Sequence, residues 1–145
     1  MTVMYKTLVS KANTSHLTTG TLFTFTGTIE IVSIIGRITT DTEAAANTCI
    51  LSITPDAQTA VDICATKDLN HLHAGTMLHI TGTLNAAMIG VDGVGVAVSQ
   101  ATKITATCVT SGVISVTYGT AAKDGAIMWE LSWLPLSQGA TVTAA

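Results

Sequence analysis

The segment Ile127–Leu134, IMWELSWL, decides the fold class because its side chains alternate between two kinds. One set is apolar and bulky, whereas the other includes Glu130 and Ser132. An extended strand turns successive side chains to opposite faces, so this period of two predicts a half-buried β-strand. Pro135 ends the strand or places it at a sheet edge. The face that we expect in the core consists of Ile127, Trp129, Leu131 and Trp133.

Outward from this segment, β-branched residues and two-residue alternation recur along most of the chain. No stretch has the spacing and length of a crossover helix, which argues against a βαβ fold. We therefore expect an all-β, single-domain β-sandwich, jelly roll or small Greek-key barrel of about nine or ten strands. The predicted strands include Tyr5–Val9, Leu22–Thr26, Thr28–Thr39, Cys49–Thr54, Thr59–Ala65, Met77–Leu84, Ala86–Val91, Val94–Ser99, Thr102–Thr110 and Val113–Tyr118.

The polar stretch Ser10–Gly20 interrupts the alternation and is typical of an arm or a long loop. We expect residues 1–20 to form an amino-terminal arm with the first strand, and residues 21–145 to form the sandwich or barrel domain. A chain of 145 residues has the length of one ordinary domain, which argues against a separate cofactor domain.

Three short segments have the composition of tight turns between strands. Pro55–Gln58 supplies proline and aspartate. Asp92–Gly93 is a dipeptide favoured in two-residue hairpins, and Ser111–Gly112 stands in the same position between two strands. We expect a hairpin at each of them, and the last two hairpins predict a meander.

The surface is short of charge. Charged residues make up only 10% of the chain, against a usual share of about 25%. Hydroxyl groups take their place, since the chain contains 27 threonines. A mean hydropathy of +0.53 and a net charge of -3 exclude a disordered chain. Six lysines and arginines are too few to neutralise many phosphates, so we expect no nucleic-acid partner.

The apolar stretches predict no membrane partner. Met1–Ser10 lacks both a basic leader and a continuous apolar run, so we expect no secretory signal. The longest uncharged stretch, Ile104–Ala122, alternates hydroxyl residues with Val and Ile and contains Gly112 and Gly119. A membrane-spanning helix needs about 20 mostly apolar residues, so this stretch is better explained by strands.

The three cysteines, Cys49, Cys64 and Cys108, do not form the even set of a disulfide scaffold, and buried thiols in a reducing compartment are expected. For Cys49 and Cys64, two strand registers are possible. A symmetric turn at Pro55–Gln58 places Cys49 opposite Cys64, where the sulfurs could bond. The apolar alternation of the two strands favours a register slipped by one, in which the thiols point to opposite sides.

Histidines 71, 73 and 79 are the candidates for a metal site, since His71 and His73 share a face if the chain is extended and His79 follows nearby. A catalytic zinc needs three protein ligands held in orientation. Here the set straddles a predicted turn, and Asp68 is the only nearby carboxylate. We therefore expect solvated imidazoles in a surface loop and no bound metal.

No residue pattern points to catalysis or to a cofactor. A cysteine nucleophile needs a histidine base and an orienting group, but all three cysteines lie in apolar alternating runs typical of small core residues. Gly90, Gly93 and Gly95 superficially match a phosphate-binding loop, but no helix follows and no lysine lies in reach. We expect no enzyme activity and no cofactor.

Trp129 and Trp133 have two interpretations. They could form a stacking platform for a sugar, as in a glycan-binding module. Because Ile127 and Leu131 share their face, we favour a place in the core.

Assembly is what the composition favours. Neutral hydroxyl surfaces are buried at lower desolvation cost than lysine or glutamate, and exposed sheet edges need covering. We expect a closed homo-oligomer with cyclic symmetry, in which Met1–Gly20 reaches over a neighbour. The contact residues expected in this arm are Tyr5, Leu8, Val9, His16 and Leu17.

Three runs carry a resemblance to a known class of proteins: residues 22–70, beginning LFTFTGTIEIVS, GTMLHITGTL at 75–84, and MWELSWLPLSQGATVTAA at 128–145. They resemble small Thr-, Ala- and Gly-rich β proteins among the virion structural proteins of tailed bacteriophages, and most of all capsid decoration, or cement, proteins. The resemblance extends from about Gly20 to the end of the chain.

This resemblance implies a protein that binds as a trimer on the outer surface of the capsid and clamps neighbouring major capsid subunits, with the amino-terminal arm as the clamp. The alternative is a tail tip or fibre domain that binds a host-surface glycan, which would need an exposed aromatic patch.

Overall fold

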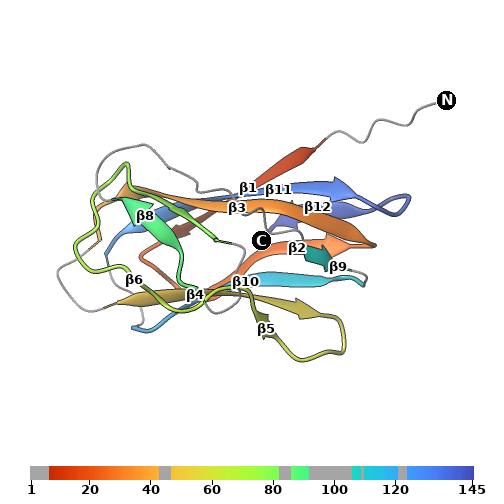
Figure 1. The fold of residues 1–145 in the computed structure, drawn as a ribbon, viewed down its shortest axis with the longest axis horizontal. Helices are drawn as coiled ribbons and strands as arrows, with labels where there is room; N and C mark the ends of the chain where they lie inside the picture. Colours follow the sequence, from red (N-terminus) through yellow and green to blue (C-terminus); the bar gives the residue numbers. More distant parts are fainter. Residues whose placement is uncertain (1–6, 43–46, 82–85, 92–105, 109, 121–123) are drawn as a thin grey trace.

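The computed structural model describes residues 7–42, 47–81, 86–91, 106–108, 110–120 and 124–145. In these residues two antiparallel sheets, each of six strands, pack face to face as a β-sandwich (Figure 1). The predicted all-β fold is confirmed. The structure describes twelve strands rather than nine or ten, because several are only two or three residues long. The predicted turn at Asp92–Gly93 and the strand Val94–Ser99 lie outside the described residues.

The first sheet, sheet A, contains three long strands and three short ones. Its order is β1-β11-β3-β7-β8, and β9 pairs with the opposite end of β3 from β7. The strands are β1 (Leu8–Ser15), β3 (Ile29–Thr40), β7 (Met77–His79), β8 (Ile89–Val91), β9 (Ala106–Cys108) and β11 (Ala126–Pro135).

The second sheet, sheet B, has the order β12-β2-β10-β4-β5, and β6 pairs with the other end of β4. The strands are β2 (Gly20–Thr26), β4 (Thr48–Pro55), β5 (Val61–Asp62), β6 (Lys67–Asp68), β10 (Gly112–Tyr118) and β12 (Thr141–Ala144).

The pairing is nested, as in a jelly roll. Strand β1 pairs with β11, β2 with β10, β3 with β9, and β4 with β5, so early strands meet late ones. The chain therefore alternates between the sheets from β1 to β4 and again from β10 to β12. This is the winding of the double-sheet jelly roll, to which β12 adds a strand beside β2. The hairpin predicted at Ser111–Gly112 is wrong, because β9 belongs to sheet A and β10 to sheet B.

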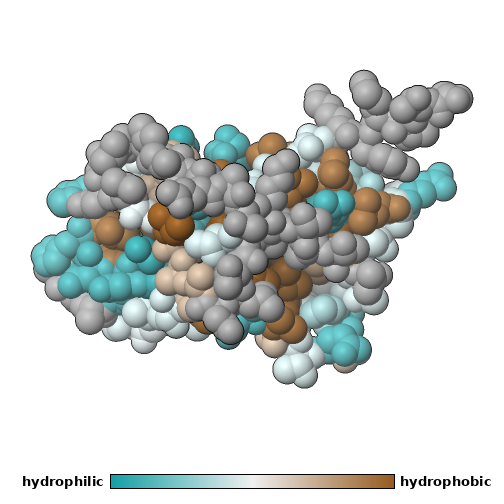
Figure 2. Space-filling model, viewed as in Figure 1, coloured by the Kyte–Doolittle hydropathy of each residue, from teal (hydrophilic) through white to brown (hydrophobic). Residues whose placement is uncertain are grey.

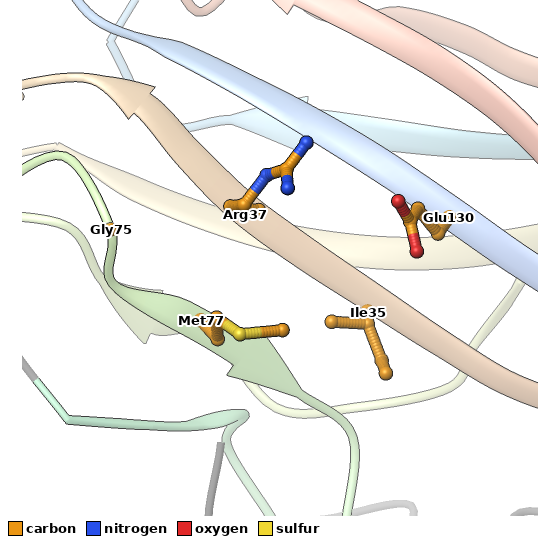
Figure 3. A pocket seen from close by; sticks show the side chains of 5 residues that line it. All are labelled: Ile35, Arg37, Gly75, Met77 and Glu130. Carbon is orange, nitrogen blue, oxygen red and sulfur yellow. The ribbon is translucent and has the colours of Figure 1, made fainter. Parts of the chain in front are cut away.

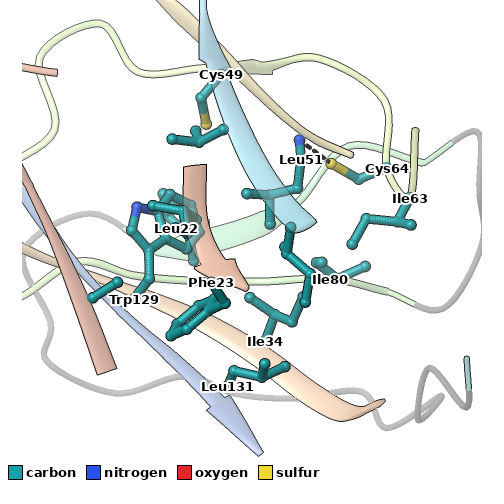
Figure 4. Close-up of a cluster of buried hydrophobic side chains, with 14 of the residues drawn as sticks. Leu22, Phe23, Ile34, Cys49, Leu51, Ile63, Cys64, Ile80, Trp129 and Leu131 are labelled. Atoms are coloured by element: carbon teal, nitrogen blue, oxygen red, sulfur yellow. Dashed lines mark hydrogen bonds between the residues drawn. The ribbon is translucent and has the colours of Figure 1, made fainter. Parts of the chain in front are cut away.

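The core lies between the sheets and is built from the alternate residues of each long strand (Figure 4). All four residues of the face that the sequence analysis placed inside are buried, with Trp129 and Leu131 fully covered. Gly36 makes room for Trp129, because a Cβ added there would lie 2.7 Å from the indole ring. Fully buried large side chains include Trp129, Phe23, Phe25, Leu17, Leu22, Ile29, Ile31, Ile38, Leu51, Leu69, Leu78 and Met88.

The amino-terminal region differs from its prediction. The stretch expected to be an arm or loop continues as strand β1 as far as Ser15, in register with β11 from Ala126 to Trp133. A turn with positive φ at His16 and Leu17 then leads toward β2. Residues 8–17 are therefore part of the sandwich rather than an arm that leaves it.

Candidate functional site

The outer face of sheet B carries hydroxyl groups over its four long strands, and it carries charge at its short strands β5 and β6, where Asp62 and Asp68 lie. Its four long strands contain no Asp, Glu, Lys, Arg or His. Since the alternate residues of these strands are buried, the remaining ones point away from the core. We call this surface the hydroxyl face; it consists of Thr24, Thr26, Ile50, Thr54, Val113, Ser115, Thr117, Thr141 and Thr143.

Threonines on the hydroxyl face bond to one another and to the sheet. The hydroxyls of Thr26 and Thr141 share a hydrogen bond across β2 and β12. Thr143 donates to the carbonyl of Thr24 at 3.5 Å. Groups that already have partners lose less when water is removed, so this face is suited to burial against protein.

The outer face of sheet A, in contrast, is charged. Lys11 Nζ lies 3.2 Å from Glu130 Oε1 across β1 and β11. Arg37 is exposed on β3, and within the described part of the chain it has no ion-pair partner. We call this surface the charged face; its charged members also include Glu30.

A small pocket of about 160 Å³ lies on the charged face. Figure 3 shows Ile35 and Met77 pointing toward each other at its base, with Arg37 and Glu130 beside them on neighbouring strands. Gly75 completes the lining. The pocket is small. The charged side chains of Arg37 and Glu130 flank an apolar base formed by Ile35 and Met77.

The three histidines are not brought together. His71 and His73 are exposed in the turn between β6 and β7, as the sequence suggested. His79 differs, because it is only 7% exposed on β7, and neither ring nitrogen has a hydrogen-bond partner. Its burial lowers the pKa of the imidazole. Among the described residues no group of three or more His, Cys, Asp or Glu could hold a metal ion.

The cysteines are free and buried. Strands β4 and β5 pair Ser52 with Asp62, which is the slipped register and not the symmetric one. The Cys64 sulfur instead accepts a hydrogen bond from the amide of Leu51 at 3.4 Å (Figure 4). Burial raises the pKa of Cys49, Cys64 and Cys108, so the thiols stay protonated and are poor nucleophiles.

The two tryptophans are core residues, 0% and 4% exposed. Their ring N–H groups donate to β1, from Trp129 to Thr14 Oγ1 at 3.3 Å and from Trp133 to Ser10 Oγ at 3.2 Å. Neither ring offers a face to a sugar, so the aromatic platform that the glycan-binding alternative requires does not come from this pair.

The residues expected at an interface fall into three groups. Leu8 and Val9 are 40% and 55% exposed at the start of β1, and the side chain of His16 is exposed near Asp124. Leu17 is fully buried in the core of its own chain, so its assignment to an interface is corrected. Tyr5 lies outside the described residues.

Figure 2 shows hydrophilic residues gathered at the end of the molecule where β6 lies.

Sequence reasoning missed the hydroxyl face as a set of residues. The absence of charge from its four strands was visible in the sequence, but their membership of one sheet was not. It missed β1 as an edge strand because the inward-facing Ser10 and Thr14 are polar. Their role as partners of the tryptophan N–H groups explains that polarity.

Comparison with known proteins gives little. No family model and no curated protein matches the chain. A solved structure described as that of the infectious bursal disease virus Gx strain matches at 13% identity with a TM-score of 0.27. The match covers 96% of this chain and 36% of that chain. Nothing about function follows from so low a score. None of the described residues forms an apolar helix of membrane-spanning length.

Proposed function

We propose that this protein is a structural protein of a virion, a capsid decoration or cement protein that assembles as a trimer on the outer surface of a phage head. In this role it joins neighbouring major capsid subunits and so strengthens the shell against the pressure of packaged DNA. It acts by burying surface and has no catalytic role.

The observation that carries the proposal is the hydroxyl face. Charged residues are depleted at the centre of protein interfaces because each one must be stripped of water. A face of four strands without a charge avoids that cost, and Thr26 and Thr141 on it already share a hydrogen bond. A surface that had only to stay in water would gain solubility from charge.

Two further features support the proposal. The sequence resembles phage virion proteins over most of its length, and the jelly roll is a fold that viral capsid domains use. Lectins use it too, so the fold by itself does not select the role.

The test uses head shells assembled without this protein, to which purified protein is added back. Wild-type protein is expected to bind the shells and to raise the temperature at which they release DNA, measured by a DNA-binding dye. Thr117→Lys places a charge on the hydroxyl face and is expected to lose both effects. Thr39→Lys is the matched control, because Thr39 is an equally exposed threonine on β3 of the other sheet.

Two results would contradict the proposal. One is that shells with and without the wild-type protein release DNA at the same temperature. The other is that Thr117→Lys binds as well as Thr39→Lys, which would mean that the hydroxyl face is not the surface used. Imaging of the decorated shells gives the oligomer, for which three copies at each binding position are expected.

A further inference from the structure

The sandwich has one long open edge in the part of the chain that the structure describes. Among the described strands, three in each sheet have an unpaired side. In sheet A these are β1, with eight residues, and β8 and β9, with three each. In sheet B they are β12, with four residues, and β5 and β6, with two each. Only β1 is long enough to accept a full strand from another chain.

The edge of β1 lacks the features that normally prevent edge pairing. Proteins protect open edges with proline, bulges, several charges or very short strands. Strand β1 contains no proline, runs in register with β11 without a shift, and has Lys11 as its only charge. Its outer backbone N–H and C=O groups therefore present a regular ladder for a partner strand.

We propose that β1 pairs antiparallel with β1 of a second copy, with Ala12 facing Ala12 across a two-fold axis. Sheet A then continues without interruption from one copy into the next. The inference does not depend on the capsid role, and it concerns an edge that the hydroxyl face does not include.

The two sides of sheet A limit the register. Ser10, Ala12 and Thr14 point toward the core, and Val9, Lys11 and Asn13 point outward. Directly opposed residues of an antiparallel pair lie on the same side of the sheet, so outward residues must face outward residues. Two registers give the longest overlap. In one, residues 8–14 of the two copies pair and Lys11 faces Lys11. In the other, residues 9–15 pair and Lys11 faces Asn13.

Charge decides between these two registers, which overlap over equal lengths. Like charges directly opposite each other destabilise a strand pair. The register centred on Lys11 would oppose two lysines, whereas the register centred on Ala12 opposes Lys11 with the neutral Asn13. Lys11 also keeps Glu130 of its own chain at 3.2 Å, so its charge is balanced at the junction.

Cysteine cross-linking reads the register directly. Lys11→Cys and Asn13→Cys are made separately, and each variant is oxidised gently, alone and in an equal mixture. The native cysteines are buried and do not compete. The proposal expects disulfide-linked dimers in the mixture only, joining position 11 to position 13. Dimers of Lys11→Cys alone, of Asn13→Cys alone, or no dimer in any sample would overturn it.

A pair of charge variants at the exposed Asn13 tests the energetics without disturbing the core. Asn13→Lys places a lysine opposite Lys11 of the other copy at both symmetric positions. It is expected to weaken dimerisation about tenfold in sedimentation equilibrium. Asn13→Asp opposes two lysine–aspartate pairs and is expected to strengthen it. Gln58→Lys, in the exposed turn before β5, is the control and leaves the dimer constant unchanged. Equal constants for both Asn13 variants would overturn the proposal.

The dimer constant, measured together with shell binding, distinguishes pairing through β1 from shell binding through the hydroxyl face. Thr117→Lys, on sheet B, is expected to keep the β1 dimer while it loses shell binding. Asn13→Lys is expected to show the reverse. If Thr117→Lys removed the dimer, the copies would be meeting through the hydroxyl face and the β1 pairing would be wrong.

Discussion

The outer faces of the two sheets differ in chemistry, although their inner faces are built alike. Both sheets bury alternate apolar residues, and both contribute an aromatic cluster, with Phe23 and Phe25 from sheet B and the two tryptophans from sheet A. Outside, the four long strands of sheet B show only hydroxyls and two aliphatic residues, with Asp62 and Asp68 on the short strands beside β4, whereas the long strands of sheet A show lysine, arginine and glutamate. Because the interior already specifies the fold, the exteriors are free to differ, and this difference is the basis for proposing sheet B as the surface that contacts other proteins.

The largest expected effect comes from disturbing sheet B from within. A Cβ at Gly112 would meet the carbonyl of Thr54 and lie 2.8 Å from Pro55 Cα, both of them backbone atoms of β4. Overpacking of this kind typically costs about 1–3 kcal/mol, so we expect Gly112→Ala to lower the free energy of unfolding by about 2 kcal/mol in urea titration. Thr117→Lys, on the outer face of the same strand, should change it by less than about 0.5 kcal/mol.

Gly112→Ala and Thr117→Lys together separate residues that hold the sheet together from residues that are available to a partner. A loss for Thr117→Lys as large as that for Gly112→Ala would mean that the hydroxyl face stabilises the single chain, and its proposed role in assembly would lose its main support.

A smaller effect is expected where the two sheets are tied together. The hydroxyl of Tyr118, on sheet B, lies 2.8 Å from Thr14 Oγ1, on sheet A, and Thr14 also accepts from the Trp129 ring. Tyr118→Phe removes one hydrogen bond and leaves Thr14 with its other partners. We expect a loss of about 1 kcal/mol in the free energy of unfolding.

Thr14→Val is the complementary variant and should cost more than Tyr118→Phe, because it removes the hydroxyl that bonds to both Tyr118 and the buried Trp129 N–H. Equal stability of wild type and both variants would show that the two sheets are held by apolar packing alone.

The smallest expected effect is a pH dependence that belongs to the sheet A side. Burial lowers the pKa of His79 below its ordinary value of 6.5. On acidification the unfolded chain takes up this proton first, so stability decreases as the pH falls below about 6.5 and levels off below the pKa of the folded state. His79→Leu should remove this part of the pH dependence in thermal melts between pH 7.5 and 5.

The hydroxyl face contains no group that titrates in this range, so Thr117→Lys should leave the shape of the pH profile unchanged. If wild type and His79→Leu lose stability in parallel on acidification, His79 does not carry the effect.

Sequence patterns predicted what depends on neighbours along the chain. Strict alternation identified the buried face of β11, and the apolar pattern of β4 and β5 favoured the slipped register that the structure has. These features follow from the two-residue period of a strand, which is a local property.

Features that depend on which strands meet could not be predicted in this way. Turn-forming residues at Ser111–Gly112 suggested a hairpin, but the chain there passes from one sheet to the other. A turn sequence does not specify the sheet of the next strand. In β1, the inward Ser10 and Thr14 concealed the alternation, because their partners are tryptophan N–H groups more than a hundred residues away.

The central claim is that the hydroxyl face is covered in the assembly while the charged face of sheet A stays open. Maleimide labelling of Thr117→Cys and Thr39→Cys, each measured dispersed and bound to shells, tests it directly, because the native thiols are buried and unreactive. We expect Thr117→Cys to react when dispersed and to be protected on the shell, whereas Thr39→Cys reacts in both states. Equal reactivity of Cys at 117 in the two states would contradict it.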